Sequence, residues 1–65
     1  MIEMISFFDV DIEIENCFFE VNLEFYKAIP MVGYHVIINR TEYEVVNVLI
    51  NYEKDSFNVY VKKVN

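Results

Sequence analysis

Polar and apolar residues alternate almost without interruption in the segment FFDVDIEIENCFFEVNLEFY, residues 7–26. A two-residue period places successive side chains on opposite faces of an extended strand. β-Branched and aromatic residues, which pack well on a pleated surface, are frequent in the remaining sequence too. The chain is therefore expected to form an all-β domain, and no window of the sequence predicts a helix.

The two halves of this segment are expected to pair as a hairpin around a turn at Glu15-Asn16. This register pairs Ile12 with Phe19, and a one-residue slip would turn acids into the core. Cys17 falls in the same apolar phase, which predicts an inert core thiol. The apolar face is made by Phe8, Val10, Ile12 and Ile14 in a first strand at residues 7–14, and by Phe19, Val21, Leu23 and Phe25 in a second at residues 18–26.

Three further strands are expected at residues 34–38, 42–50 and 57–64. Pro30 and Gly33 interrupt the alternation before them, and a turn is expected near residues 39–41. The apolar phase changes at Val45-Val46, which predicts a β-bulge. In the last strand Phe57, Val59 and Val61 are expected to face inward, and Asn58, Tyr60 and Lys62 outward.

The predicted fold is therefore a single all-β domain over residues 1–65. Five short antiparallel strands, arranged as an N-terminal hairpin followed by a three-stranded meander, would form a small barrel or a strongly bent sheet.

The segment IPMVGYHVIINRTEYEVVNV resembles the P-x-x-G-x-x-V-x-I and Y-x-V-x-x-V pattern of small β-barrels of the Src-homology-3-like class, which are frequent among short phage proteins. The resemblance covers about a third of the chain and implies a small barrel, a phage source and no catalytic residue. Tyr34 replaces the usual acid after the glycine, and Asn39-Arg40 replaces the usual hairpin glycine. The matching positions are Pro30, Gly33, Val36, Ile38, Tyr43, Val45 and Val48.

A domain of 65 residues buries only about 60% of its unfolded surface, yet 55% of the residues are hydrophobic and 17% aromatic. Some apolar surface is therefore expected outside the monomer core, which favours a homodimer or another homo-oligomer. The net charge of −6 argues against direct binding of nucleic acid or of an anionic membrane.

The only cysteine, Cys17, excludes an internal disulfide, and the first residues lack the basic region of a signal peptide. The longest uncharged run, residues 28–39, contains Pro and Gly and is too short to span a bilayer. A cytoplasmic protein is expected, located in the host cytoplasm if it is phage-encoded.

Residue types that carry enzyme chemistry are scarce, because the chain holds one His, one Cys and one Gly. Cys17, beside the predicted hairpin turn, and His35, in the strand at residues 34–38, could pair in principle as nucleophile and base, but the apolar phase of Cys17 favours a core thiol, and no Cys/His spacing indicates zinc. Phosphate-binding glycine loops are absent. The sequence therefore predicts a non-enzymatic protein without a metal or cofactor.

Seven acidic residues and no Lys or Arg fall within residues 1–25. Alternate residues on a strand are separated by roughly 6.5–7 Å, which is close to the spacing of phosphates along one nucleic-acid strand. A row of acids at alternate positions of a strand would therefore suit a basic groove of another protein. The alternative is a solvated face that keeps the hairpin soluble. The predicted partner-binding residues are Asp9, Asp11, Glu13, Glu15, Glu20 and Glu24, with the interspersed aromatic residues Phe7, Phe18 and Tyr26.

These observations favour an interaction protein, phage-encoded as the resemblance above implies, that inhibits a host defence protein by occupying a basic surface of that protein. A structural or assembly component of a virion is the first alternative. Binding of single-stranded nucleic acid is the second, because cations and aromatic residues occur together in the second half of the chain. The residues for that alternative are Lys27, Arg40, Lys54, Lys62 and Lys63, with Tyr52, Phe57 and Tyr60.

Overall fold

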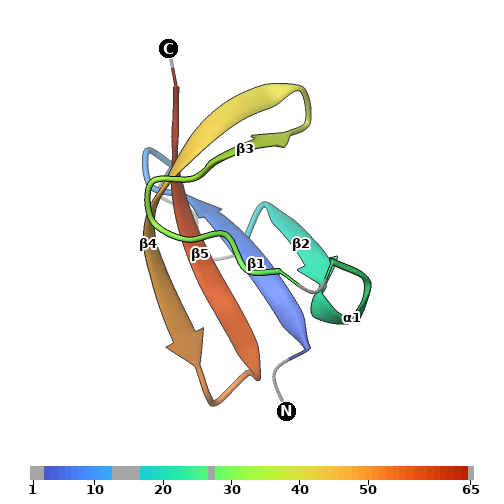
Figure 1. Cartoon of the computed structure of the whole chain (residues 1–65). Coiled ribbons are helices and arrows are strands. Elements are labelled where there is room, and N and C mark those ends of the chain that lie inside the picture. Colours follow the sequence, from blue (N-terminus) through green and yellow to red (C-terminus); the bar gives the residue numbers. More distant parts are fainter. Residues whose placement is uncertain (1–2, 13–16, 27, 65) are drawn as a thin grey trace.

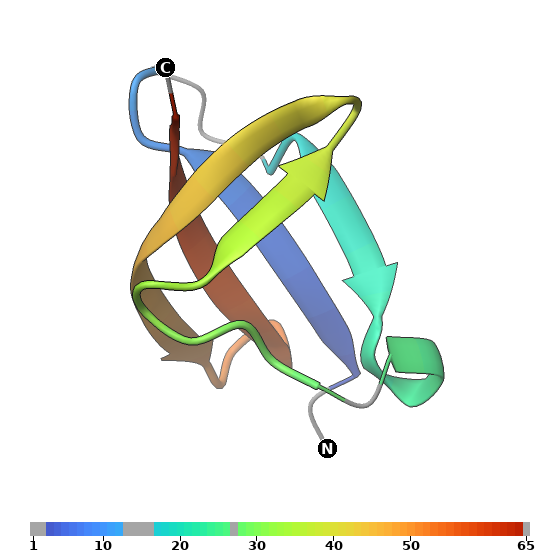
Figure 2. The same ribbon diagram turned by 45° about the horizontal axis from the view of Figure 1, so that its top comes forward.

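Five strands form one sheet in the computed structural model, which describes residues 3–12, 17–26 and 28–64 (Figure 1). The strand order across the sheet is β2-β1-β5-β4-β3. The sheet bends into a nearly closed barrel, which confirms the predicted all-β fold (Figure 2). The strands are β1 Met4–Asp9, β2 Phe19–Asn22, β3 His35–Ile38, β4 Thr41–Asn51 and β5 Ser56–Lys63, and a four-residue helix, α1 Leu23–Tyr26, follows β2.

The three-stranded meander of β3, β4 and β5 forms as predicted. Asn39 and Arg40 connect β3 to β4 with φ angles of 52° and 64°, the left-handed conformation that a two-residue hairpin turn needs at both positions. The pairing of β4 with β5 shifts between Val45 and Asn47, which confirms the predicted bulge. Because of this shift, Val45 and Val48 both pack into the core.

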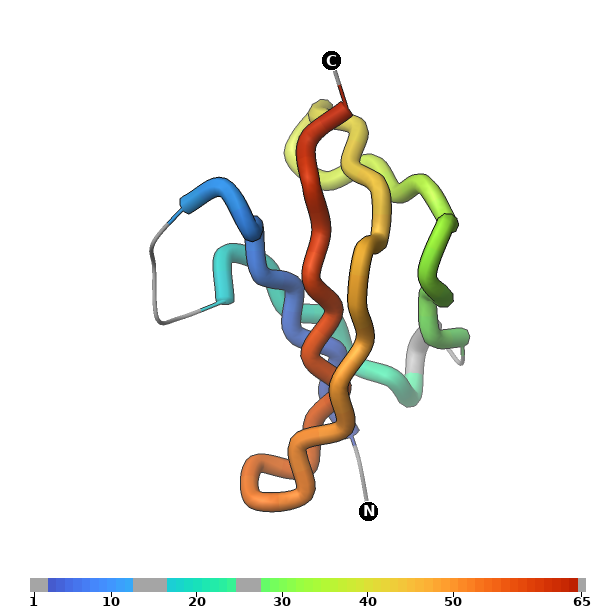
Figure 3. Tube along the Cα trace, turned by 90° about the vertical axis from the view of Figure 1, so that its left-hand side faces the viewer, coloured from blue at the N-terminus to red at the C-terminus, as the bar shows by residue number. Residues whose placement is uncertain are grey.

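The segment before β3 runs beside β4 (Figure 3). Gly33 N donates to Val45 O over 2.9 Å, and Val45 N donates to Tyr34 O over 2.8 Å. Gly33 has a φ of 96°, which residues with a Cβ rarely adopt. The glycine therefore lets the chain turn into β3 while it stays hydrogen-bonded to β4.

The predicted N-terminal hairpin exists, but its register is wrong by five residues. β1 and β2 are antiparallel and pair Ile5 with Val21 and Phe7 with Phe19. The predicted first strand extended to residue 14, whereas β1 ends at Asp9. Val10 and Ile12, which were expected in the core, are 47% and 48% exposed. The predicted turn at residues 15–16 and its neighbour Ile14 lie outside the described residues.

The second predicted strand is shorter than expected because a helical turn replaces its last part. β2 ends at Asn22, whose side-chain Oδ1 accepts a hydrogen bond from Glu24 N over 2.8 Å. Asn is among the preferred residues for capping the first turn of a helix in this way. The prediction that no helix forms is therefore wrong for Leu23–Tyr26, although this element is a single turn.

The sheet is mixed, so the prediction of purely antiparallel strands is wrong for one pair. β1 lies parallel to β5 in the middle of the sheet, with Ile5 beside Phe57 and Phe7 beside Val59. A strand that is paired on both edges has its inward side chains covered along its whole length. Ile5 and Phe7, rather than Phe8 and Val10, enter the core from this strand.

The core gathers apolar side chains from four of the five strands. Val59 and Val61 were predicted to face inward, and both are fully buried, while Phe57 is half-buried. Phe7 contacts Phe19 with ring centroids 5.9 Å apart. No helix in the described part of the chain is long and apolar enough to cross a membrane. The buried apolar residues are Ile5, Phe7, Ile38, Val45, Val59 and Val61.

Candidate binding site on the outer face of the sheet

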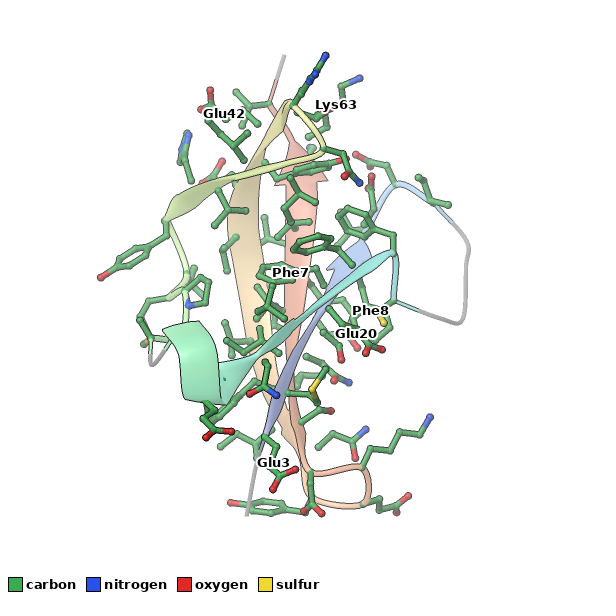
Figure 4. The ribbon with its side chains drawn as sticks, turned by 90° about the vertical axis from the view of Figure 1, so that its right-hand side faces the viewer. Glu3, Phe7, Phe8, Glu20, Glu42 and Lys63 are labelled. Carbon is green, nitrogen blue, oxygen red and sulfur yellow. The ribbon has the colours of Figure 1, made fainter. Side chains whose placement is uncertain are left out.

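The side chains that alternate with the core residues of β1 and β5 form an outer face. The parallel register places Ser6 beside Asn58 and Phe8 beside Tyr60. These residues border a hollow of about 420 Å³, which also reaches β2 and the turn between β4 and β5. In Figure 4, Phe8 and Glu20 lie near one another on this side, whereas Phe7 lies within the barrel.

An aromatic pair forms one wall of the hollow. The Phe8 and Tyr60 rings stack with centroids 5.1 Å apart and planes inclined by 20°. Both side chains are half-buried, so they stabilise the sheet and still present aromatic surface. The outward orientation of Tyr60 was predicted from the sequence, and that of Phe8 was not.

Neutral polar groups form the floor. Ser56 Oγ donates to Asn58 Oδ1 over 3.0 Å, so the Asn58 Nδ2 amide remains as a donor. Ser6 and Ser56 are 9% and 5% exposed. Among the described residues, every buried side-chain nitrogen or oxygen has a hydrogen-bond partner. The floor is therefore a preformed hydrogen-bonding surface rather than a strained one.

Cys17 and Glu20 border the hollow from the β2 side. Cys17 Sγ donates to Glu20 Oε1 over 2.9 Å. Burial raises the pKa of the Cys17 thiol, and the hydrogen bond to Glu20 and the charge of that carboxylate raise it further. A raised pKa lowers the thiolate fraction at neutral pH, and the inertness of the thiol stays a prediction; its predicted position in the core is wrong, because Cys17 is half-buried beside the outer face.

Lys54 borders the hollow from the opposite side, in the turn between β4 and β5. Asn51 Oδ1 accepts hydrogen bonds from Glu53 N and Lys54 N, both over 3.1 Å. These two bonds hold the backbone of the turn while the Lys54 side chain stays exposed. The hollow thus has a carboxylate on one side and an ammonium on the other.

The described acids of the predicted partner-binding face do not lie in one row. Asp9 ends β1, and Asp11 lies in the following turn, where its N–H donates to Asp9 Oδ1 over 2.9 Å. Glu24 lies at the other end of the barrel, in α1, and Glu20 lies on the outer face. Glu13 and Glu15 are outside the described residues.

Two of the aromatic residues predicted to interrupt the acidic face, Phe7 and Phe18, do not belong to it. Phe7 is 5% exposed and lies in the core. Phe18 packs against the core and contacts Tyr43, with ring centroids 5.4 Å apart. Phe7 was assigned to the wrong face because Phe occupies both positions 7 and 8, so the two faces of the strand are equally apolar there. The side chain of Tyr26 is outside the described part of the structure.

The fold instead gathers four exposed acids from three segments at one end of the barrel. Glu3 N donates to Asp55 O over 3.2 Å, and Leu23 N donates to Glu3 O over 2.8 Å, so β1, α1 and the β4–β5 turn meet there. Figure 4 shows Glu3 at this end and Glu42 and Lys63 at the other. We call this surface the acidic end; its acids are Glu3, Glu24, Glu53 and Asp55, and they are all exposed.

Few charges are neutralised within the fold. Among the described residues, the one contact within 4 Å between a basic and an acidic side chain is a hydrogen bond of 2.6 Å between His35 Nδ1 and Glu42 Oε2, at the end opposite the acidic end. The described residues contain no cluster of three potential metal ligands.

The basic residues of the second half do not form one stripe. Lys54 lies at the acidic end, whereas Arg40, Lys62 and Lys63 lie toward the other end of the barrel. Phe57 is half-buried and pairs with Ile5 and Ile50 in the sheet. Lys27 is outside the described residues. The surface predicted for single-stranded nucleic acid is therefore divided between two ends of the molecule.

The chain matches no protein-family model, and neither its sequence nor its fold matches a characterised protein or a solved structure.

Proposed function

We propose that this chain is a non-enzymatic interaction protein that binds a basic surface of another protein through its acidic end. The observation that supports the proposal is the gathering of four exposed carboxylates from separate segments, with Lys54 as the only described cation beside them. In the proposal this surface replaces the row of acids that the sequence predicted.

The two ends of the barrel differ in the charges that they carry. The opposite end carries Arg40, Lys62 and Lys63 beside its acids. Counting only the described residues, three cations lie beside the acids of the opposite end, whereas four acids and one cation lie at the acidic end; Glu13, Glu15 and Lys27 are outside this count. A basic partner is steered toward the acidic end, and the rate of association falls as salt screens the charges.

The partner we propose is a host defence protein, and the chain a phage-encoded inhibitor acting in the host cytoplasm. The similarity of residues 29–48 to small phage barrels of the Src-homology-3-like class supports this attribution. An inhibitor of this kind needs no catalytic group; it occupies a surface that the partner uses for another ligand.

Assembly into a larger particle is the second candidate, and exposed apolar residues near the β3 edge favour it. Ile37 is 76% exposed on the edge strand β3, and Val32 is 62% exposed in the segment before it. His35 and Ile37 lie between the hydrogen-bonded positions of the β3–β4 pair, so their backbone groups point away from β4. Such an edge can pair with a second copy, as in the proposed homodimer, or with a neighbour in a virion.

The test compares two variants that remove the same amount of charge from opposite ends. The acidic-end variant carries Glu3→Gln, Glu24→Gln, Glu53→Gln and Asp55→Asn. The control carries Asp9→Asn, Asp11→Asn, Glu42→Gln and Glu44→Gln. Each variant and the wild type is immobilised and exposed to a bacterial lysate at low and at physiological salt, and the bound proteins are identified by mass spectrometry.

The expected result is a basic protein that binds the wild type and the control, dissociates as the salt concentration rises, and is lost from the acidic-end variant. Circular dichroism of both variants should remain that of the wild type, because all the substituted side chains are at the surface or half-buried. Identical sets of bound proteins for the two variants would refute the proposal.

A further inference from the structure

The hollow on the outer face has the size and the mixed chemistry of a small-ligand site. Its volume of about 420 Å³ falls within the range of pockets for small organic molecules. One wall is the stacked pair of Phe8 and Tyr60, and the floor carries Ser6 and Asn58. A ligand that fits it must offer a flat apolar part and several hydrogen-bonding groups.

The two charged residues define the ends of such a ligand. Glu20 comes from β2 and Lys54 from the turn after β4, and β1 and β5 lie between them. Strands are spaced by about 4.8 Å, so β2 and β4 are about 14 Å apart at the same level of the sheet. A ligand that reaches both side chains is therefore longer than a single ring.

Each charged group has capacity left for a ligand. Cys17 Sγ uses Oε1 of Glu20, which leaves Oε2 to accept a hydrogen bond from an amine. The described structure records no ion pair for Lys54 within 4 Å, so its ammonium can bind an anionic group. The complementary ligand has an amine at one end and an anion at the other.

We infer that this hollow binds a mononucleotide whose base carries an exocyclic amine. The base packs against the Phe8–Tyr60 pair, as bases do on aromatic side chains in single-stranded recognition. Its amine donates to Glu20, and its phosphate binds Lys54. Ser6 and Asn58 supply hydrogen bonds to the sugar hydroxyls in between.

Other classes of small molecule would contact fewer of the groups that line this hollow. A neutral monosaccharide would use the floor and the aromatic wall but leave Lys54 without a role. A free amino acid would satisfy both charges but would be too short for the span between β2 and β4. A long nucleic-acid strand would place several phosphates against the acids around Lys54 and would be repelled there, whereas a mononucleotide places only one phosphate on Lys54. The same chemistry could be offered by a free nucleotide or by the end of a short strand.

The test is titration of the ¹⁵N-labelled wild-type protein with AMP, GMP, CMP and UMP, followed by NMR chemical shifts. We expect saturable shifts at Ser6, Asn58 and the Asn58 side-chain amide with at least one of the amine-bearing nucleotides. UMP, which lacks the amine, and the nucleoside that lacks the phosphate should each bind about tenfold more weakly.

Two variants with matched controls separate the contributions of the charged groups. Glu20→Gln should weaken binding of the amine-bearing nucleotide about tenfold, and the control Glu24→Gln should not. Lys54→Gln should weaken nucleotide binding about tenfold without changing nucleoside binding, and the control Lys63→Gln should change neither. All four side chains are exposed, so the fold should be retained in each variant.

Three outcomes would overturn the inference. The first is the absence of saturable shifts with every nucleotide up to 10 mM. The second is binding of glucose as strong as that of the nucleotides. The third is binding of a single-stranded tetranucleotide more than tenfold tighter than that of its mononucleotides, which would assign the site to a strand. None of these outcomes depends on the protein partner proposed for the acidic end.

Discussion

Replacing Phe7 with alanine should cost far more stability than the same change at the neighbouring Phe8. Phe7 is 5% exposed and contacts Phe19, so its replacement removes a buried aromatic side chain. Such a change in a core costs about 3–5 kcal/mol. A domain of this length has roughly 3–10 kcal/mol of stability in total. The variant Phe7→Ala should therefore be largely or marginally unfolded.

Phe8 provides the matched control because it has the same side chain one position along β1. It is half-buried on the outer face and stacks on Tyr60. Losing the stacked pair costs about 0.5–1.5 kcal/mol, and half of a burial term of 1.5–3 kcal/mol adds to it. We expect a total cost of about 1–3 kcal/mol for Phe8→Ala, so that this variant still folds.

Urea denaturation followed by circular dichroism measures the difference. With a slope of about 1 kcal/mol per molar urea, the midpoint should fall by about 1–3 M for Phe8→Ala and by about 3–5 M for Phe7→Ala. The reverse order would mean that Phe8 faces the core. The register of β1 with β2 and β5 described above would then be wrong.

Three further results are expected. Because the pKa of Cys17 is raised in the folded protein, the folded state keeps the thiol proton that the unfolded chain loses; stability should fall as the pH rises above about 8.5. Cys17→Ala should remove that part of the pH dependence in urea melts, and an unchanged profile would contradict the assignment. Arg40→Gly should raise the free energy of unfolding by up to about 1 kcal/mol, because glycine adopts a φ of 64° without strain; a lower midpoint would speak against the turn geometry. Light scattering at micromolar concentration should give the mass of a dimer, and Ile37→Lys should give that of a monomer; a monomeric wild type would exclude the β3 edge as a contact between copies.

The sequence predicted the second half of the fold more accurately than the first half, for a physical reason. Between residues 34 and 64 the alternation predicted the inward positions of Val59 and Val61, and its change at Val45-Val46 marks the bulge, although Ile37 and Leu49 are apolar and exposed. Near the N-terminus, Ile5 and Phe7 form one apolar phase and Phe8, Val10 and Ile12 form the other. The local alternation of polar and apolar residues does not show which of these two phases faces the core. That depends on the pairing with β5, which is distant in the sequence.

The candidate site was only partly predictable for the same reason. The outward positions of Asn58 and Tyr60 follow from the pattern of β5 and are confirmed by the burial of their neighbours. Their neighbours Ser6 and Phe8 come from β1, and only the parallel pairing brings them together. No short motif signals this combination, because its members are common residues from distant segments. The acidic end was missed likewise, since its acids are separated in the sequence.

The parallel pair of β1 and β5 also bears on how the protein is made. Ile5 pairs with Phe57, about 50 residues later, so at synthesis rates of roughly 5–20 residues per second β1 waits about 3–10 s for its partner. During that time the apolar residues of β1 are exposed to other chains emerging nearby. Glu3 directly precedes β1, Asp9 is its last residue, and Asp11 follows two residues later. Charges in such positions hinder aggregation of an unpaired strand. On this view the acids of the N-terminal segment protect the nascent chain, a role they complete before the barrel exists.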